Sequence, residues 1–161
     1  MRDDDPRLIS SRIRQLIEDM RAQWHGLDQR IAAFNAEFVS AARNEASARR
    51  LSTISGIGAI NATALVAAVG DARSFARARD LAAWLGLVSR QATTGGRPRL
   101  LGITKRGNKY LRTLLIHGAR AALPSLVAAE SPLGNWLRGL SARAHRNTVI
   151  VALASKLARI A

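Results

Sequence analysis

Apolar residues recur along the first part of the chain at spacings that alternate between four and three positions. A helix with this spacing carries them in one stripe, as the a and d positions of a coiled coil. The pattern predicts one long helix over residues 7–48, beginning after Pro6, and indicates self-association. An ordinary helix that folds back onto the rest of the chain is the alternative. The stripe, called the seam below, consists of Ile13, Ile17, Met20, Trp24, Leu27, Ile31, Phe34 and Phe38.

The pattern changes after Leu51, where glycines and small residues replace the heptad spacing. We expect a helix end, a turn at Gly56-Ile57-Gly58 in which Ile57 packs into the core, and a helix to about Val69. Glycine permits positive φ and close backbone approach, and a helix begins with N–H groups that have no helical partner. The turn therefore resembles a helix-hairpin-helix element, which presents backbone amides to a DNA phosphate. A plain turn between helices is the alternative.

Helical spacing of apolar residues predicts four further helices, over 76–85, from Asn108 to a break near Pro124, over 132–143 and over 147–160. Asn147 is the expected N-cap of the last one. Trp84 and Trp136 are assigned to the core, and His117 to a buried packing position. The predicted fold class is all-α, with a coiled-coil helix over residues 1–50 and a helical domain over 51–161.

Residues 87–108 contain glycines and a proline that forbid a continuous helix, so they predict a long loop, with a short β-hairpin as an option. Thr93 and Thr94 precede Gly95-Gly96, and no acidic residue lies in the loop. Hydroxyls among arginines are what phosphoryl transfer requires of a nucleophile and its charge stabilisers. The residues alone favour the simpler alternative, a loop that grips phosphate without chemistry. Its basic residues continue into the next helix and are Arg90, Arg97, Arg99, Lys105, Arg106, Lys109 and Arg112.

Charge is distributed unequally along the 161 residues, whose formal net charge is +14. The first fifty residues hold nine basic and eight acidic side chains, whereas the remainder holds 16 basic residues and three acids. An excess of positive charge in one part of the chain favours nucleic acid as the partner, because basic side chains that neutralise phosphates release the bound counterions. An arginine-rich composition with solvated faces is the alternative.

Other partners and locations are disfavoured. No helix concentrates basic residues opposite a bulky apolar face, and no apolar run reaches the roughly 18 residues of a membrane span, so we expect no membrane contact and a cytoplasmic protein. The chain has no cysteine and three separated histidines. We therefore expect no metal site and no cofactor in this chain.

A set of motifs in fixed order resembles the carboxy-terminal domain of the insertion-sequence 116/110/902 transposases. The motifs are Ile54-Ser-Gly-Ile-Gly58, Gly70-Asp71, Arg79-Asp-Leu-Ala-Ala-Trp-Leu-Gly-Leu87, Thr93-Thr-Gly-Gly96, Gly102-Ile-Thr-Lys-Arg-Gly-Asn108, Tyr110-Leu-Arg-Thr-Leu-Leu-Ile-His-Gly-Ala-Arg120 and Val151-Ala-Leu-Ala-Ser-Lys-Leu-Ala-Arg-Ile160. The resemblance covers nearly everything from Leu51 to Ala161, and the preceding helix resembles the family's coiled coil.

The resemblance implies DNA transposition by two domains. An amino-terminal RuvC-like domain with four acidic ligands would hold Mg²⁺, and this carboxy-terminal domain would supply a serine nucleophile. That position falls on Thr93, whose β-branch restricts χ1 and crowds in-line attack. The resemblance also implies DNA and a structured guide RNA as partners, and the seam predicts a homo-oligomer. The glycine turn and the basic loop predict the phosphate contacts Gly56, Gly58, Thr94, Arg97, Arg99, Lys105, Arg106, Lys109 and Arg112.

No RuvC-like domain is recognised in the sequence, so the resemblance indicates a truncated or split transposase that binds DNA and dimerises. Strand cleavage through Thr93 is one alternative to this reading. A non-catalytic helix-hairpin-helix protein that binds nucleic acid is the second, and a structural oligomer with incidental charge is the third.

Overall fold

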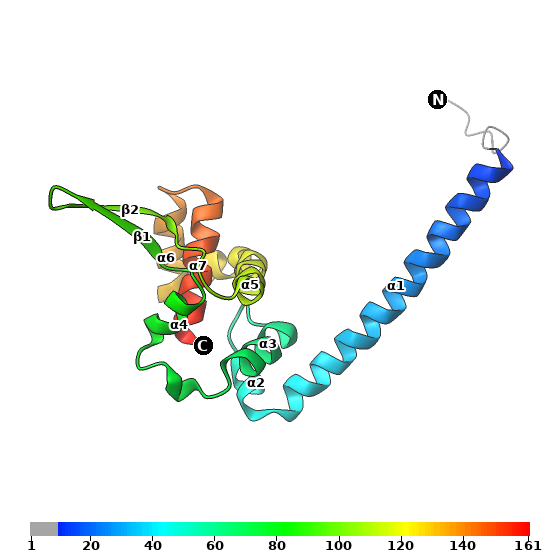
Figure 1. Cartoon of the computed structure of the whole chain (residues 1–161), viewed down its shortest axis with the longest axis horizontal. Coiled ribbons are helices and arrows are strands. Elements are labelled where there is room, and N and C mark those ends of the chain that lie inside the picture. Colours follow the sequence, from blue (N-terminus) through cyan, green and yellow to red (C-terminus); the bar gives the residue numbers. More distant parts are fainter. Residues whose placement is uncertain (1–9) are drawn as a thin grey trace. The chain divides into compact units, whose positions relative to one another are not determined.

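The computed structural model describes residues 10–161, which form helices and a two-stranded hairpin (Figure 1). The all-α prediction is confirmed. The chain divides into two compact units, one ending at Phe38 and one running from Val39 to Ala161. The elements are α1 (Ser11–Asn44), α2 (Ala46–Leu51), α3 (Ala59–Val69), a 3₁₀ helix η1 (Ala72–Ser74), α4 (Ala78–Trp84), β1 (Ser89–Thr94), β2 (Arg97–Ile103), α5 (Lys109–Ala128), α6 (Pro132–Ser141) and α7 (Arg146–Ile160).

Helix α1 confirms the long amino-terminal helix but ends earlier than predicted. Pro6 and residues 7–9 lie outside the described residues. At the other end the helix stops at Asn44, because Glu45 adopts an extended backbone (φ −95°, ψ 123°) before α2 begins. The Arg49 guanidinium donates to the carbonyl of Arg43, one of the last carbonyls of α1. The bend lets Ala48 of α2 be fully buried while α2 packs against α3.

The core of the second unit lies where α5 packs against α7, with α3, α4 and α6 around them. Alanines on these helices, such as Ala119 and Ala154, are fully buried and let the helix backbones approach closely. The largest fully buried side chains are Ile57, Leu85, Leu111, Leu115, Leu137, Ile150, Leu153 and Leu157. Ile57 is buried as the sequence predicts, so the turn that contains it is part of the core.

Helix α5 continues through Pro124 to Ala128, so the predicted break is wrong. Proline removes one backbone donor and clashes with the preceding turn, but it need not end a helix whose neighbours hold it in place. Here Leu123 is buried beside the proline, and the Ser125 hydroxyl donates to the Ala122 carbonyl at 2.9 Å.

Three side-chain assignments are also corrected. The N-cap of α7 is His145, whose Nδ1 accepts from the Asn147 amide at 3.2 Å. Trp84 is 38% exposed and packs edge-to-face on Phe75, because Leu85 takes the buried position beside it. His117 is exposed, since the buried residues of α5, Leu115 and Ala119 among them, lie on the other side of that helix.

Trp136, which the sequence pattern assigns to the core, is half-buried and packs against the core. The Lys156 ammonium lies 4.6 Å from the centre of its ring, which places a cation over the aromatic face.

Candidate nucleic-acid interface

The basic loop is an antiparallel hairpin that projects from the helices of the second unit (Figure 1). Its register pairs Thr94 with Arg97 across a two-residue turn. The turn glycines Gly95 and Gly96 have φ values of 59° and 74°, which is the pattern of a type I′ turn and which glycine adopts without strain. Both strands are exposed along nearly their whole length. The predicted hairpin option is therefore confirmed.

The register decides which side chains share a face of the hairpin. Directly opposite residues in an antiparallel pair lie on the same face, and residues alternate faces along each strand. Arg97 pairs with Thr94 and Arg99 pairs with Ala92, so both arginines share one face with Thr94. We call this set, Thr94, Arg97 and Arg99, the basic face.

Thr93, at the predicted nucleophile position, lies on the opposite face. It pairs with Pro98, and its hydroxyl accepts a hydrogen bond from the Gln91 amide nitrogen at 3.2 Å. The sequence suggested that Arg97 and Arg99 surround both threonines. In the structure they share a face only with Thr94, because consecutive residues of a strand point to opposite sides.

Two glycines allow close backbone contact at the base of the hairpin, where the chain leaves α4 and where it returns before α5. A Cβ at Gly86 would overlap the backbone carbonyl oxygen of Arg106, and a Cβ at Gly107 would overlap that of Trp84. The Lys105 amide donates to the Gly86 carbonyl at 3.1 Å, and the Thr104 amide donates to the Val88 carbonyl at 2.8 Å. Close backbone packing therefore fixes where the hairpin leaves the core.

Arg112 does not join the exposed cations. It is 9% exposed, and its guanidinium donates to the Leu85 carbonyl at 3.0 Å, next to the last turn of α4. A cation suits a helix carboxyl end, where carbonyls lack helical partners. The neighbouring Asn108 side chain caps α5 by accepting from the Leu111 amide at 3.1 Å. Both residues hold α5 against the hairpin base, a role that the charge pattern alone did not suggest.

Three further predicted contacts, Lys105, Arg106 and Lys109, are exposed between the hairpin and the start of α5. Lys105 has φ 57°, a left-handed backbone that non-glycine residues rarely adopt. The surrounding backbone bonds hold it there, and strained residues of this kind often occur at functional sites. These cations continue the positive surface from the hairpin to its base.

The turn between α2 and α3 is packed tightly against α5. Gly56 has φ 96°, and a Cβ added to Gly118 would overlap its carbonyl oxygen. The Asn61 side-chain nitrogen donates to the carbonyls of Gly56 (3.1 Å) and Leu114 (3.3 Å). Gly118 and Asn61 therefore position the turn. A glycine inside the predicted α5 helix was the signal that could have identified the close approach.

Gly58 does not use the positive φ that glycine permits, in contrast to Gly56. Its backbone is extended (φ −84°, ψ −178°), and it precedes α3 without a side-chain cap. A Cβ at this position would meet no atom within 4 Å. Gly58 is exposed, and no side chain caps the start of α3, where helix amides can bind an anion.

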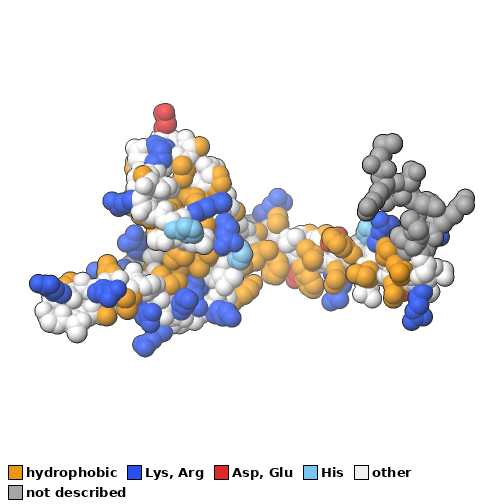
Figure 2. All heavy atoms as spheres, turned by 90° about the horizontal axis from the view of Figure 1, so that it is seen from above, with side chains coloured by type: hydrophobic (Ala, Val, Ile, Leu, Met, Phe, Trp, Pro, Cys, Tyr) orange, Lys and Arg blue, Asp and Glu red, His pale blue; other side chains and the backbone are white. Residues whose placement is uncertain are grey.

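Positive charge dominates the described surface of the second unit. Asp71 accepts from the Arg73 amide (2.9 Å) and Asp80 from the Arg77 amide (3.0 Å), so these carboxylates hold the starts of η1 and α4. Figure 2 shows Lys and Arg side chains over one face of this unit and on the projecting hairpin.

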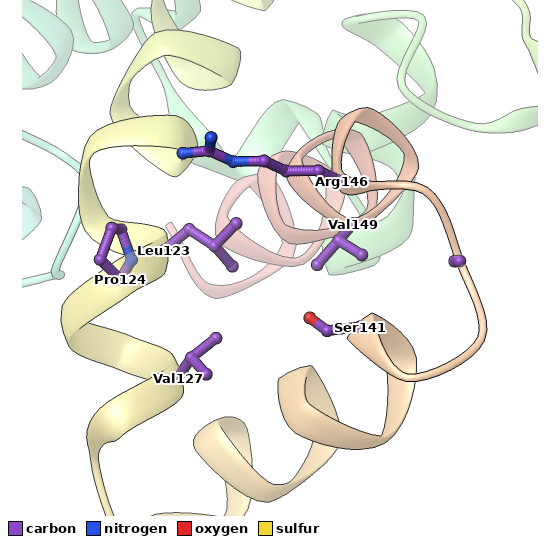
Figure 3. A pocket seen from close by; sticks show the side chains of 7 residues that line it. Leu123, Pro124, Val127, Ser141, Arg146 and Val149 are labelled. Atoms are coloured by element: carbon purple, nitrogen blue, oxygen red, sulfur yellow. The ribbon is translucent and has the colours of Figure 1, made fainter.

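Two hollows of the second unit are lined by none of the predicted site residues. The first, of about 300 Å³, lies among α5, α6 and the start of α7; Figure 3 shows Leu123 and Val127 facing Ser141 and Val149, with Arg146 extended across the opening. The second, of about 800 Å³, is lined by residues such as Leu65, Phe75 and Leu81. The candidate interface is therefore an exposed surface of the hairpin and lies outside both hollows.

Neither a metal cluster nor a membrane span is found in the part of the chain that the structure describes. Within residues 10–161, no three His, Asp or Glu side chains come together as metal ligands. The described residues therefore do not fit the Mg²⁺ that the resemblance assigns to a RuvC-like domain. No helix in the same range is both long and apolar enough to cross a bilayer.

The sequence matches transposases over almost its full length. Over 156 residues, 97% of this chain, it is 44% identical to a protein of Pseudomonas aeruginosa described as "Probable family 20 transposase". It is 40% identical over 147 residues, 91% of this chain, to the transposase for insertion sequence element IS1328 of Yersinia enterocolitica. It is 38% identical over 152 residues, 94% of this chain, to the transposase for insertion sequence element IS1111A of Coxiella burnetii.

The chain spans less than half the length of these relatives, 46%, 44% and 42% respectively. Residues 48–130, just over half of the chain, match the model of the family described as "Transposase IS116/IS110/IS902 family". This range contains the glycine turn, the hairpin and α5. The chain therefore belongs to the IS116/IS110/IS902 family of transposases.

Proposed function

We propose that this chain supplies the part of a transposase that binds the DNA backbone and self-associates. The observation that carries the first half is the basic face, Thr94, Arg97 and Arg99, on an exposed hairpin whose base is packed against α4. Arginine matches phosphate geometry with two donors, and a short, fixed hairpin loses little entropy on binding. A DNA partner requires a compartment that contains DNA, which agrees with the cytoplasmic location that the sequence predicts.

The turn before α3 supports a second backbone contact. The start of α3 has no side-chain cap, and the Gly58 residue before it is exposed with no atom within 4 Å of its Cβ position. Lys105, Arg106 and Lys109 supply further exposed cations. Arginines, lysines and backbone amides of this kind bind phosphates, and none of them lies on a helix placed to contact base edges. We therefore propose that this surface binds DNA with little sequence discrimination.

Salt-dependent binding of duplex DNA tests the proposal. Arg97→Ala and Arg99→Ala should each lower affinity and reduce the slope of log affinity against log salt by about 1 per lost phosphate contact. Arg12→Ala removes the same charge from the exposed surface of α1, outside the seam, and should change the slope far less. A salt slope unchanged in both hairpin variants would contradict the proposal.

Gly58→Val tests the turn separately. The backbone of Gly58 is extended and its side-chain space is open, so the valine variant should fold, although valine is a poorer N-cap than glycine by about 1 kcal/mol. We expect weaker DNA binding with only a small decrease in the urea midpoint. An unchanged DNA affinity would show that the turn does not contact DNA.

A structured guide RNA carries the same phosphate groups as DNA, so the phosphate contacts alone do not distinguish these two partners. The same titrations with a structured RNA and with duplex DNA compare the two. Stronger RNA binding that also depends on Arg97 and Arg99 would assign the basic face to the guide.

Self-association through α1 is supported by the exposure of the seam. Met20 and Trp24 are each 69% exposed, and every other seam residue is at least 39% exposed. Figure 2 shows hydrophobic side chains along the helix. A contiguous apolar stripe of this length marks an interaction surface. Leu27→Glu should shift the sedimentation of the chain to the monomer, whereas Gln29→Glu, off the seam on the same helix, should leave it unchanged.

Strand cleavage is the second candidate, and the hairpin register favours Thr94 over Thr93 for it. In such a step the threonine oxygen would bond to a backbone phosphorus, one sugar oxygen would leave, and the hydroxyl proton would pass to it. A covalent adduct lost in Thr94→Val and retained in Thr93→Val would support Thr94. The reverse result would support Thr93 as the nucleophile. If the wild-type chain forms no adduct, strand cleavage by this chain is excluded and only the binding proposal stands.

A further inference from the structure

We infer that two copies of α1 pair antiparallel, with Trp24 of each copy against Leu27 of the other. The inference rests on the proposed self-association and adds its orientation and register. The seam reads the same from either end, because its spacings of four and three residues are palindromic. An antiparallel partner therefore meets every seam residue, as a parallel partner also would, and side-chain size and charge must decide between them.

Side-chain size favours the antiparallel pair. In the parallel register each residue faces its own copy, so Trp24 meets Trp24 and Phe34 meets Phe34, while isoleucines meet at the other end. In the antiparallel register each large aromatic residue meets a smaller aliphatic one. The layers are then Ile13 with Phe38, Ile17 with Phe34, Met20 with Ile31 and Trp24 with Leu27, each occurring twice. Layers of similar volume keep the interhelical distance constant along the pair.

Charge beside the seam points the same way. Arg21 and Asp28 follow Met20 and Leu27, so both occupy the e position of the heptad, and both are exposed. Antiparallel helices bring e positions together, and the register above places Arg21 of one copy beside Asp28 of the other, twice per dimer. Parallel helices pair g with e five residues on. That arrangement places Arg21 beside Leu16 and Asp28 beside Gln23, with no opposite charges in contact.

Spin-label distances test the orientation, and the absence of native cysteine allows one thiol per chain. Gln15 and Gln29 both occupy the f position and are exposed, so Gln15→Cys and Gln29→Cys form a matched pair. In the antiparallel register, the two labels at position 15 are offset by about 30 Å along the helix axis. The labels at position 29 are offset by only about 10 Å, at a rise of roughly 1.5 Å per residue.

The expected result is a label-to-label distance at least about 10 Å longer for Gln15→Cys than for Gln29→Cys in the full chain. Equal distances would establish a parallel pair and overturn the inference while leaving self-association intact. A monomer, or a dimer without dipolar coupling at either position, would overturn both. The two readings therefore fail in distinguishable ways.

A charge exchange provides an independent test by sedimentation equilibrium. Arg21→Glu or Asp28→Arg alone would place like charges together twice and should weaken the dimer roughly threefold to tenfold. The double variant Arg21→Glu/Asp28→Arg should recover the affinity of the original chain to within about twofold. Equal weakening in the single and double variants would overturn the antiparallel register.

Discussion

Single glycines decide how closely the backbone segments of the second unit approach one another. Gly118 of α5 lies against the Gly56 carbonyl, and a Cβ there would also approach the Asn61 side-chain nitrogen to 2.8 Å. Gly139 of α6 has no atom within 4 Å of the corresponding position. The two glycines are both helical, but only one is required by its surroundings.

Gly118→Ala should therefore destabilise the second unit by about 2–4 kcal/mol, because the turn must move away from α5. Gly139→Ala should stabilise by roughly 0.5–1 kcal/mol, since alanine loses less backbone entropy in a helix. Urea unfolding of both variants measures the difference. Similar midpoints for the two would show that the turn does not pack on α5 as described.

At the scale of elements, the hairpin shows which features the local sequence pattern predicts and which depend on the tertiary structure. The Gly95-Gly96 turn and the lack of helical spacing were visible in the sequence, and so was the option of a hairpin. The faces were not, because moving the strand register by one residue transfers every side chain to the other side. The same limit applied to the end of α1, where burial of Ala48 bends a chain whose local pattern continues as helix.

The turn chemistry predicts contrasting effects at Gly95. A type I′ turn favours Asn-Gly, so Gly95→Asn should preserve the hairpin and its DNA affinity. Gly95→Val places a β-branched residue at φ 59° and should lower hairpin stability by about 1–2 kcal/mol and weaken DNA binding. Amide exchange across β1 and β2, with parallel DNA titrations, provides the measurement. Equal affinity for both variants would mean that the hairpin geometry does not matter for binding.

At the scale of the whole molecule, the proposed functions lie in different units. The seam residues belong to the unit ending at Phe38, and the basic face belongs to the unit from Val39 onward. Linking two DNA-binding surfaces through α1 would make the second contact with DNA intramolecular, which raises the apparent affinity without new contacts.

Leu27→Glu should therefore weaken binding to a long duplex by about 10²-fold or more, while binding to a duplex that admits one copy changes little. The urea midpoint of the second unit should stay the same, because Leu27 lies outside it. Equal losses on both duplexes would indicate that α1 contributes to DNA contact itself.

The sequence by itself determined the helical class, the long apolar seam, the buried Ile57 and the family, because each depends on local spacing or on a run of motifs. Its charge distribution also predicted the region of the proposed interface. Only the tertiary structure decided that Arg112 is buried against the end of α4, that α5 continues through Pro124, and that Thr94 rather than Thr93 shares a face with Arg97 and Arg99. The burial of Arg112 and the course of α5 depend on which distant backbone segments pack together, and the face of Thr94 depends on the strand register. Neither can be read from the local spacing of apolar residues.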